Sequence, residues 1–134
     1  MSDWEELGRE VVAEGDLTRL REALGLNRSS MSELLRTSVV TYTQWEQGNV
    51  RLWPTTAERI GRFYHLAQNH LDLLNKAGIP IKDLIPLHHA TRTLGVSQSL
   101  LLKRYREEVI DAEDLGILGL WLYKEDLERI RDVL

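Results

Sequence analysis

The sequence predicts an all-α, or mainly α-helical, protein of two small modules joined by a long helix, the second module carrying a short β-hairpin. Apolar residues recur at intervals of three and four over most of the chain, as expected for amphipathic helices. Glycine and proline interrupt this pattern and set the helix ends. The length of 134 residues suits one compact domain or two minimal modules. Because residues 78–86 hold two of the three prolines, we place the modules at residues 1–77 and 78–134.

The first module is expected to contain an acidic N-terminal helix and four further helices. Ser2 and Glu5 have the spacing of a capping box, so the first helix begins beside them. The third helix is expected to start at Asn27 or Ser29, and Ser38 is suited to cap the fourth. The five helices are expected at about residues 3–14, 16–24, 27–35, 38–47 and 54–77.

The second module is expected to begin with two short helices, over residues 87–94 and 98–108, separated by Gly95-Val96-Ser97. Residues 115–123 combine glycine with bulky apolar side chains, which favours a short hairpin over a helix. A last helix is expected over residues 124–133. The apolar side chains of that segment expected to point inward are Leu127, Ile130 and Leu134.

Net charge and composition restrict the classes of function. The chain carries a net charge of −4, but residues 1–16 and 108–134 each carry −5, so the middle of the chain is basic. A duplex responds to local potential, so a basic middle can bind DNA while the acidic ends face away, although these acids equally suit a solubilising surface. With no cysteine, no long apolar run and an acidic start, we expect a cytoplasmic protein without disulfides, membrane spans or a signal peptide.

The third and fourth expected helices are separated only by Arg36 and Thr37, and so short a turn sets two helices at a steep angle. The residues around this turn are Leu24-Gly25-Leu26-Asn27 and residues 31–48, which end in Trp45-Glu46-Gln47-Gly48. Over about residues 17–66 the chain resembles the Xre family, the helix-turn-helix of Cro and phage repressors. It departs from the family at three positions. The family usually has alanine where this chain has Ser32, glycine where it has Arg36, and valine or isoleucine where it has Thr37.

The Xre resemblance implies that the fourth helix is the recognition helix of a DNA-binding domain. Its predicted base-reading residues are Val39, Val40, Thr43 and Gln44. A glutamine amide can pair with adenine in the major groove, and valine can contact the methyl group of thymine. Glu46 resembles the family's glutamate, which is a structural rather than a base-reading residue. The phosphate-binding residues that the resemblance implies are Asn27, Arg28, Ser38, Asn49 and Arg51.

A second motif covers residues 84–130, with Leu94-Gly95-Val96-Ser97 at its turn and residues 116–123 as its hairpin. This segment resembles a winged helix-turn-helix of the MerR or excisionase type. The groove-facing residues that the resemblance implies are Ser97, Gln98, Ser99, Leu102, Lys103 and Arg106, and the phosphate-binding ones are Arg92 and Arg104. The run Lys103-Arg104-Tyr105-Arg106 also suits a solvated basic face at a helix C-terminus. The hairpin residues Ile117, Leu118 and Leu120 are apolar enough to form an oligomer surface instead.

Together these motifs predict a sequence-specific double-stranded DNA-binding transcriptional regulator rather than an enzyme. The Xre resemblance favours a phage-type immunity repressor that occludes promoters on a double-stranded operator, with a homodimer as one possible state. Two alternatives stay open, an antitoxin-like or adaptor protein and an excisionase-like architectural factor. We expect no cofactor, no small-molecule ligand and no metal site, since His65 and His70 are five positions apart and fall on different faces of a helix.

Overall fold

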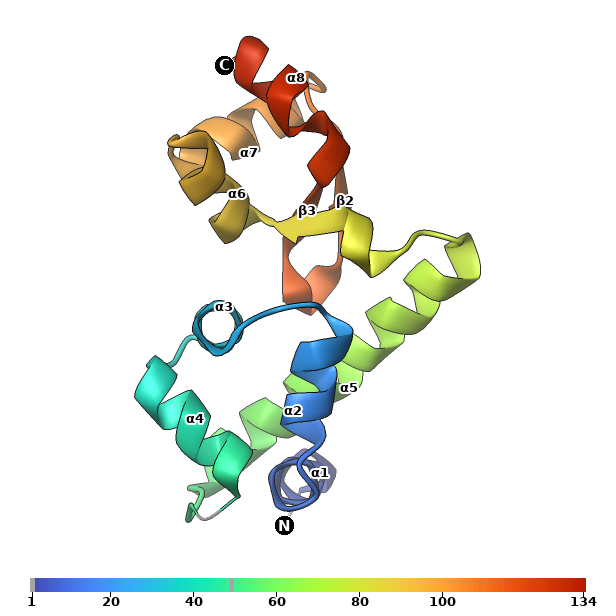
Figure 1. The fold of residues 1–134 in the computed structure, drawn as a ribbon. Coiled ribbons are helices and arrows are strands. Elements are labelled where there is room, and N and C mark those ends of the chain that lie inside the picture. Colours follow the sequence, from blue (N-terminus) through green and yellow to red (C-terminus); the bar gives the residue numbers. More distant parts are fainter. Residues whose placement is uncertain (1, 49) are drawn as a thin grey trace. The chain divides into compact units, whose positions relative to one another are not determined.

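The computed structural model describes residues 2–48 and 50–134, and it is mainly α-helical with a small antiparallel sheet (Figure 1). The predicted fold class is therefore confirmed. The chain divides into two compact units, Met1–Asp72 (unit 1) and Leu73–Leu134 (unit 2). This division lies within the long helix, rather than at its end near residue 77. None of the described helices combines the length and the apolar character needed to cross a bilayer.

Unit 1 is built from helices whose ends lie within one or two residues of those predicted. Ser2, Asn27 and Ser38 each accept a hydrogen bond from the backbone N–H three residues on, so side chains define three helix starts. Because Asn27 is the cap, the third helix starts there and not at Ser29. The helices are α1 (Asp3–Ala13), α2 (Asp16–Ala23), α3 (Arg28–Leu34), α4 (Val39–Gln47) and α5 (Pro54–Ala77), of which the last continues into unit 2.

Two glycines let helices α1 and α5 cross in close contact. A Cβ atom on Gly8 would lie 1.8 Å from the carbonyl oxygen of Ala57, and one on Gly61 would lie 2.1 Å from that of Trp4. Neither position has room for a side chain, so the backbones touch directly. The rest of the unit 1 core is mainly apolar, and its fully buried large side chains are Val11, Leu17, Leu20, Met31, Tyr42 and Ile60.

Unit 2 combines three short helices with three short strands. The sheet order is β1-β3-β2 with antiparallel pairing throughout, so β3 is the central strand. In register, Ile85 of β1 and Ala112 of β2 both lie opposite Leu122 of β3. The elements are the 3-10 turn Ile81–Asp83, β1 (Leu84–Pro86), α6 (Leu87–Leu94), α7 (Gln98–Arg106), β2 (Ala112–Asp114), the 3-10 turn Gly116–Leu118, β3 (Leu120–Tyr123), the 3-10 turn Lys124–Asp126 and α8 (Leu127–Asp132).

The predicted hairpin exists, but its strands differ from those expected. Its first strand is Ala112–Asp114, before the expected start at residue 115, because Leu115 and Leu118 turn into the core. The expectation that Leu118 lies on an exposed apolar wing is therefore wrong, whereas Ile117 is exposed. Strand β1 was expected to be part of a module boundary, yet it pairs with β3 and is buried along its whole length.

The bounds of helix α7 and of the last helix also differ from those predicted. Helix α7 ends at Arg106, because Glu108 adopts a left-handed backbone conformation with φ 61°. The last helix begins as a 3-10 turn and becomes α-helical only at Leu127. Of the side chains expected to point inward there, Ile130 is buried, while Leu127 and Leu134 are partly buried against the same core. Leu102, which the resemblance placed toward a groove, also packs against this core.

Candidate nucleic-acid interface

A tight turn joins α3 to α4, and the unusual residue Arg36 lies within it. Arg36 has a φ of 54°, in the left-handed region that glycine occupies most readily. The backbone N–H groups of Arg36 and Thr37 donate to the carbonyl oxygens of Glu33 and Ser32 at 3.1 Å and 3.0 Å. These bonds close the C-terminus of α3, so the turn forms despite the departure from glycine.

Helix α4 has one buried and one exposed face. Tyr42 and Trp45 form its buried face. Val40 and Gln44 lie on the opposite side and are exposed, Val40 to 66%, and Val39 at the helix start is 44% exposed. The four residues predicted to read bases therefore lie toward the N-terminal part of one helix, and three of them are open to solvent. The two adjacent valines form a small exposed apolar patch at the helix start.

Thr43, the fourth predicted base reader, is partly buried. Its hydroxyl donates to the carbonyl oxygen of Val39 at 2.7 Å. This local bond fixes the side chain along the helix, so Thr43 presents its methyl group and a lone pair of its oxygen rather than a free donor.

The carboxylate of Glu46 holds two arginines and ties three helices together. Its oxygens lie 2.7 Å from Nε of Arg21 in α2 and 3.0 Å from Nε of Arg28 at the start of α3. Burial of this carboxylate acts to raise its pKa, but hydrogen bonds from Arg21, Tyr42 and Arg28 outweigh it and lower the pKa to about 2. With the side chain only 2% exposed, Glu46 sets the position of α4 and cannot reach a base.

The residues predicted to bind phosphate have several structural duties. Asn27 Oδ1 accepts the N–H of Ser30 at 2.8 Å, and Ser38 Oγ accepts that of Thr41 at 3.1 Å. Arg28 donates to Glu46, so its guanidinium is partly occupied in the free protein. Of the other residues predicted to bind phosphate, Arg51 is exposed and Asn49 lies outside the described residues.

Helical spacing identifies one exposed residue of α4 that was not among the predicted base-reading residues. Gln47 lies three positions after Gln44 and seven after Val40, which places all three on one side of α4. It is exposed, and periodicity alone was enough to find it. Its place at the C-terminal end of α4 extends the polar outer face over the whole length of the helix.

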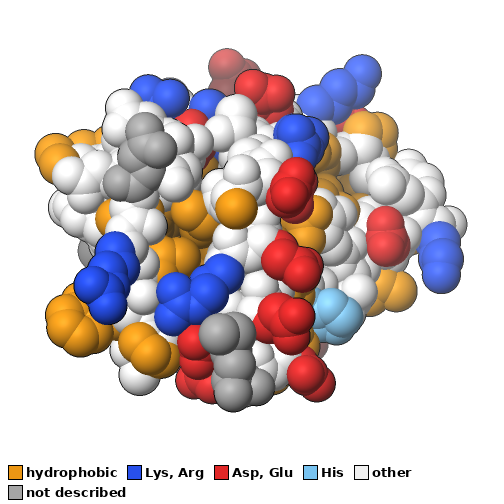
Figure 2. Space-filling view, turned by 90° about the horizontal axis from the view of Figure 1, so that it is seen from below, with side chains coloured by type: hydrophobic (Ala, Val, Ile, Leu, Met, Phe, Trp, Pro, Cys, Tyr) orange, Lys and Arg blue, Asp and Glu red, His pale blue; other side chains and the backbone are white. Residues whose placement is uncertain are grey.

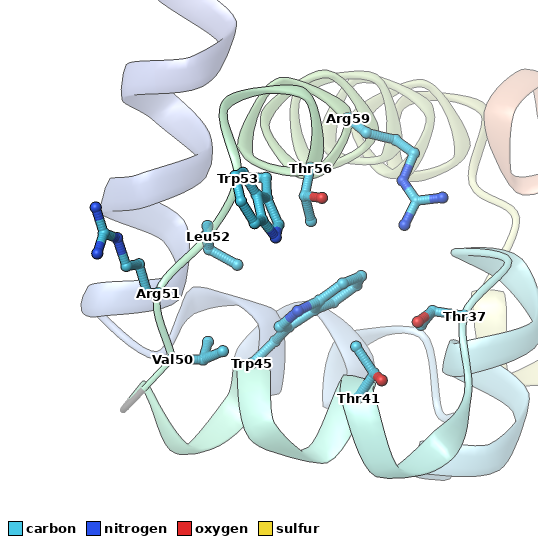
Figure 3. A pocket seen from close by; sticks show the side chains of 9 residues that line it. All are labelled: Thr37, Thr41, Trp45, Val50, Arg51, Leu52, Trp53, Thr56 and Arg59. Carbon is cyan, nitrogen blue, oxygen red and sulfur yellow. The ribbon is translucent and has the colours of Figure 1, made fainter.

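A pocket of about 280 Å³ lies beside α4 and was not predicted (Figure 3). Trp53 is 78% exposed and faces Trp45 across this pocket, while Arg51 points away from it. The guanidinium carbon of Arg59 lies 5.9 Å from the centroid of the Trp45 ring. The lining residues are Thr37, Thr41, Trp45, Val50, Arg51, Leu52, Trp53, Thr56 and Arg59.

In unit 2, α6 and α7 form a second pair of helices with a short connection. Ser97 caps α7 by accepting the N–H of Leu100 at 3.1 Å. The predicted readers Ser99, Lys103 and Arg106 are exposed at intervals of four and three, so they share one side of α7. The other predicted contacts are Gln98 and Arg92, which are exposed, and Arg104, which is partly buried and pairs with Glu107 at 2.9 Å.

Charge is unevenly distributed over the surface. The face seen in Figure 2 carries acidic side chains in a continuous band, with basic and hydrophobic side chains gathered beside it. In the sequence the acidic residues concentrate near the two ends of the chain, where residues 1–16 and 108–134 each carry a net charge of −5. The described residues contain no group of three or more His, Cys, Asp or Glu able to hold a metal ion.

Comparison with known proteins identifies one domain. A family model described as a helix-turn-helix domain matches residues 15–74. The prediction of a helix-turn-helix in this region is thereby confirmed, and the match agrees with the resemblance to Xre-type domains. It ends at residue 74, so the winged helix-turn-helix in residues 84–130 stays a prediction. No curated protein and no solved structure matches the chain.

Proposed function

We propose that this protein is a sequence-specific regulator that binds double-stranded DNA through α4, on the premise that residues 15–74 form a helix-turn-helix domain. The observation that carries the proposal is the outer face of α4, where Val39, Val40 and Gln44 are exposed while Tyr42 and Trp45 anchor the helix. A helix that is fixed on one side and bears small polar and apolar side chains on the other suits the major groove.

The side chains of this face determine which bases it would recognise. The Gln44 amide has both a donor and an acceptor, which match N7 and the N6 amino group of adenine. Val39 and Val40 offer methyl groups but no hydrogen bonds, so they suit the C5-methyl group of thymine. We therefore expect a site that contains A·T pairs where the N-terminal half of α4 enters the groove.

Phosphate contacts would fix the position of α4 on the duplex. Arg51 is exposed next to α4, and Arg28 and Ser38 lie at the N-terminal ends of α3 and α4. Such contacts supply affinity without sequence information, and they weaken as salt neutralises the phosphates. A protein that covers a promoter in this way would exclude polymerase. The resemblance of residues 17–66 to phage repressors is the basis for proposing a phage-type immunity repressor that acts in the cytoplasm.

The exposed row on α7, with Ser99, Lys103 and Arg106, supports a second DNA contact by a winged segment. If both units touch one duplex, a monomer would protect a long asymmetric site. A homodimer that reads through α4 alone would instead protect two half-sites about 34 Å apart. The length and symmetry of a nuclease footprint separate these two arrangements.

Selection of bound duplexes from a random pool tests the proposal directly. The full chain, at fixed salt, is expected to enrich one short motif that contains A·T pairs, because base contacts add to phosphate contacts. Equal retention of all sequences would contradict it, since that result indicates phosphate binding alone. Failure to retain any duplex would favour the adaptor role, in which the helices bind another protein.

A further inference from the structure

The pocket beside α4 is close in size to the smallest small-molecule sites, and its lining combines aromatic, hydroxyl and basic side chains. Its volume of about 280 Å³ is close to the lower end of the range for ligand pockets, about 300–1,000 Å³. It is built from the turn before α4, from α4 itself, and from the start of α5 and the segment leading to it. All of these segments belong to unit 1.

Two tryptophans, Trp53 and Trp45, lie on opposite sides of this pocket. Trp53 is 78% exposed, whereas Trp45 on the other side is 3% exposed and anchored in the core. The two indoles face each other across open space in Figure 3. An indole left this open is unusual, because large aromatic side chains normally bury most of their surface against another group. A flat ring lying against Trp53 and above Trp45 would cover it.

The charge of the lining residues indicates that the ligand is an anion. Arg59 contacts the ring of Trp45, and among the described residues no carboxylate forms an ion pair with its guanidinium. None of the lining residues is acidic, and Thr37, Thr41 and Thr56 add hydroxyl groups. A planar guanidinium beside an aromatic surface suits a carboxylate, to which it can donate two parallel hydrogen bonds.

We propose that this pocket binds a small planar aromatic carboxylate, with its ring against Trp53 and its carboxylate on Arg59. The pocket includes Thr37 from the turn and Thr41 from α4. A bound ligand would therefore touch the helix to which we assign DNA reading, and any effect on DNA affinity rests on that proposed function. Binding of the ligand does not, so it is measured without DNA.

Isothermal titration of the full chain with 2-naphthoate tests the proposal. Saturable binding at one site per chain is expected, and 2-naphthalenemethanol, which has the same rings without the charge, should bind about tenfold more weakly or worse. No saturable binding of 2-naphthoate, or equal binding of the neutral compound, would overturn the proposal. This comparison uses the unmodified protein, so it does not depend on the folding of any variant.

Two arginine variants locate the site. Arg59→Gln should weaken 2-naphthoate binding by about tenfold. Arg62→Gln is the matched control, because Arg62 is also exposed on α5 and its guanidinium carbon lies 5.9 Å from the ring of another tryptophan, Trp4, but it does not line the pocket. The control should bind as the unmodified protein does. Equal weakening by both substitutions would indicate general attraction to positive charge and would refute the assignment.

Discussion

Replacing Glu46 with glutamine should destabilise the protein in a manner that depends on pH. Glu46→Gln keeps the shape of the side chain but removes the charge that Arg21 and Arg28 share. The pKa of Glu46 is lowered from 4.5 to about 2, and each unit corresponds to about 1.4 kcal/mol, which sets an upper bound of roughly 3 kcal/mol. Because Arg28 is half exposed and solvent screens its interaction, we expect a loss of about 1–2 kcal/mol at pH 7.

The direction of the pH effect follows from a pKa that is lower in the folded state. The stabilisation by Glu46 is complete above its unfolded pKa of 4.5 and is lost as the pH falls toward about 2. The difference in unfolding free energy between the unmodified protein and Glu46→Gln should therefore be largest at pH 7 and less than half as large at pH 3. Other carboxyl groups titrate in both proteins and cancel in this difference.

Urea denaturation followed by circular dichroism, at pH 7, 5, 4 and 3, measures this difference. Glu22→Gln is the control, because Glu22 is exposed on α2, and it should change the unfolding free energy by less than about 0.5 kcal/mol. A Glu46→Gln variant that is as stable as the unmodified protein at pH 7, or a difference that stays constant down to pH 3, would refute the reasoning.

Two further substitutions test the backbone geometry of unit 1. Arg36→Gly should raise the unfolding free energy by about 0.5–1 kcal/mol, measured by the same denaturation, because it removes the strain of a left-handed arginine; a loss of stability would contradict the turn described. Gly8→Ala should lower the midpoint of thermal unfolding by at least about 5 °C, because its Cβ would lie 1.8 Å from the carbonyl oxygen of Ala57 and force α1 and α5 apart. An unchanged midpoint would mean that the two helices do not cross in this way.

The helices of unit 1 could be predicted because their signals are local. Caps such as Ser38 and the periodic apolar residues act within a few positions of the chain, so α1 to α5 were placed nearly correctly. The crossing of α1 and α5 depends instead on Gly8 meeting Ala57, which lies far along the chain. A single glycine inside a helix does not reveal which backbone it approaches.

The sheet of unit 2 was harder to predict, because its strands depend on pairing across the chain. Leu84–Pro86 is only three residues long and follows a proline-containing loop, so its sequence indicates a linker. It becomes a strand because it pairs with Leu120–Tyr123. Strand Ala112–Asp114 contains two acids and has no alternating apolar pattern, and it too is defined by its partner.

The candidate site was predictable where it follows helical periodicity and not where it needs tertiary packing. The exposed face with Val40 and Gln44 follows from spacing along α4. The ion pairs of Glu46 could not be predicted, because the sequence does not indicate that Arg21 and Arg28 both contact it. The pocket between Trp45 and Trp53 likewise arises from two segments whose separation the sequence does not specify.

The measurement that tests DNA reading by α4 most directly is the ratio of dissociation constants for the selected duplex and a scrambled one, at equal salt. Gln44→Ala should raise the dissociation constant for the selected duplex, and so this ratio, about tenfold and leave binding to the scrambled duplex nearly unchanged, because it removes a base contact and no phosphate contact. Gln68→Ala, on α5, is the control and should change neither constant. An equal loss on both duplexes, or no loss on either, would contradict the assignment of α4 as the reading helix.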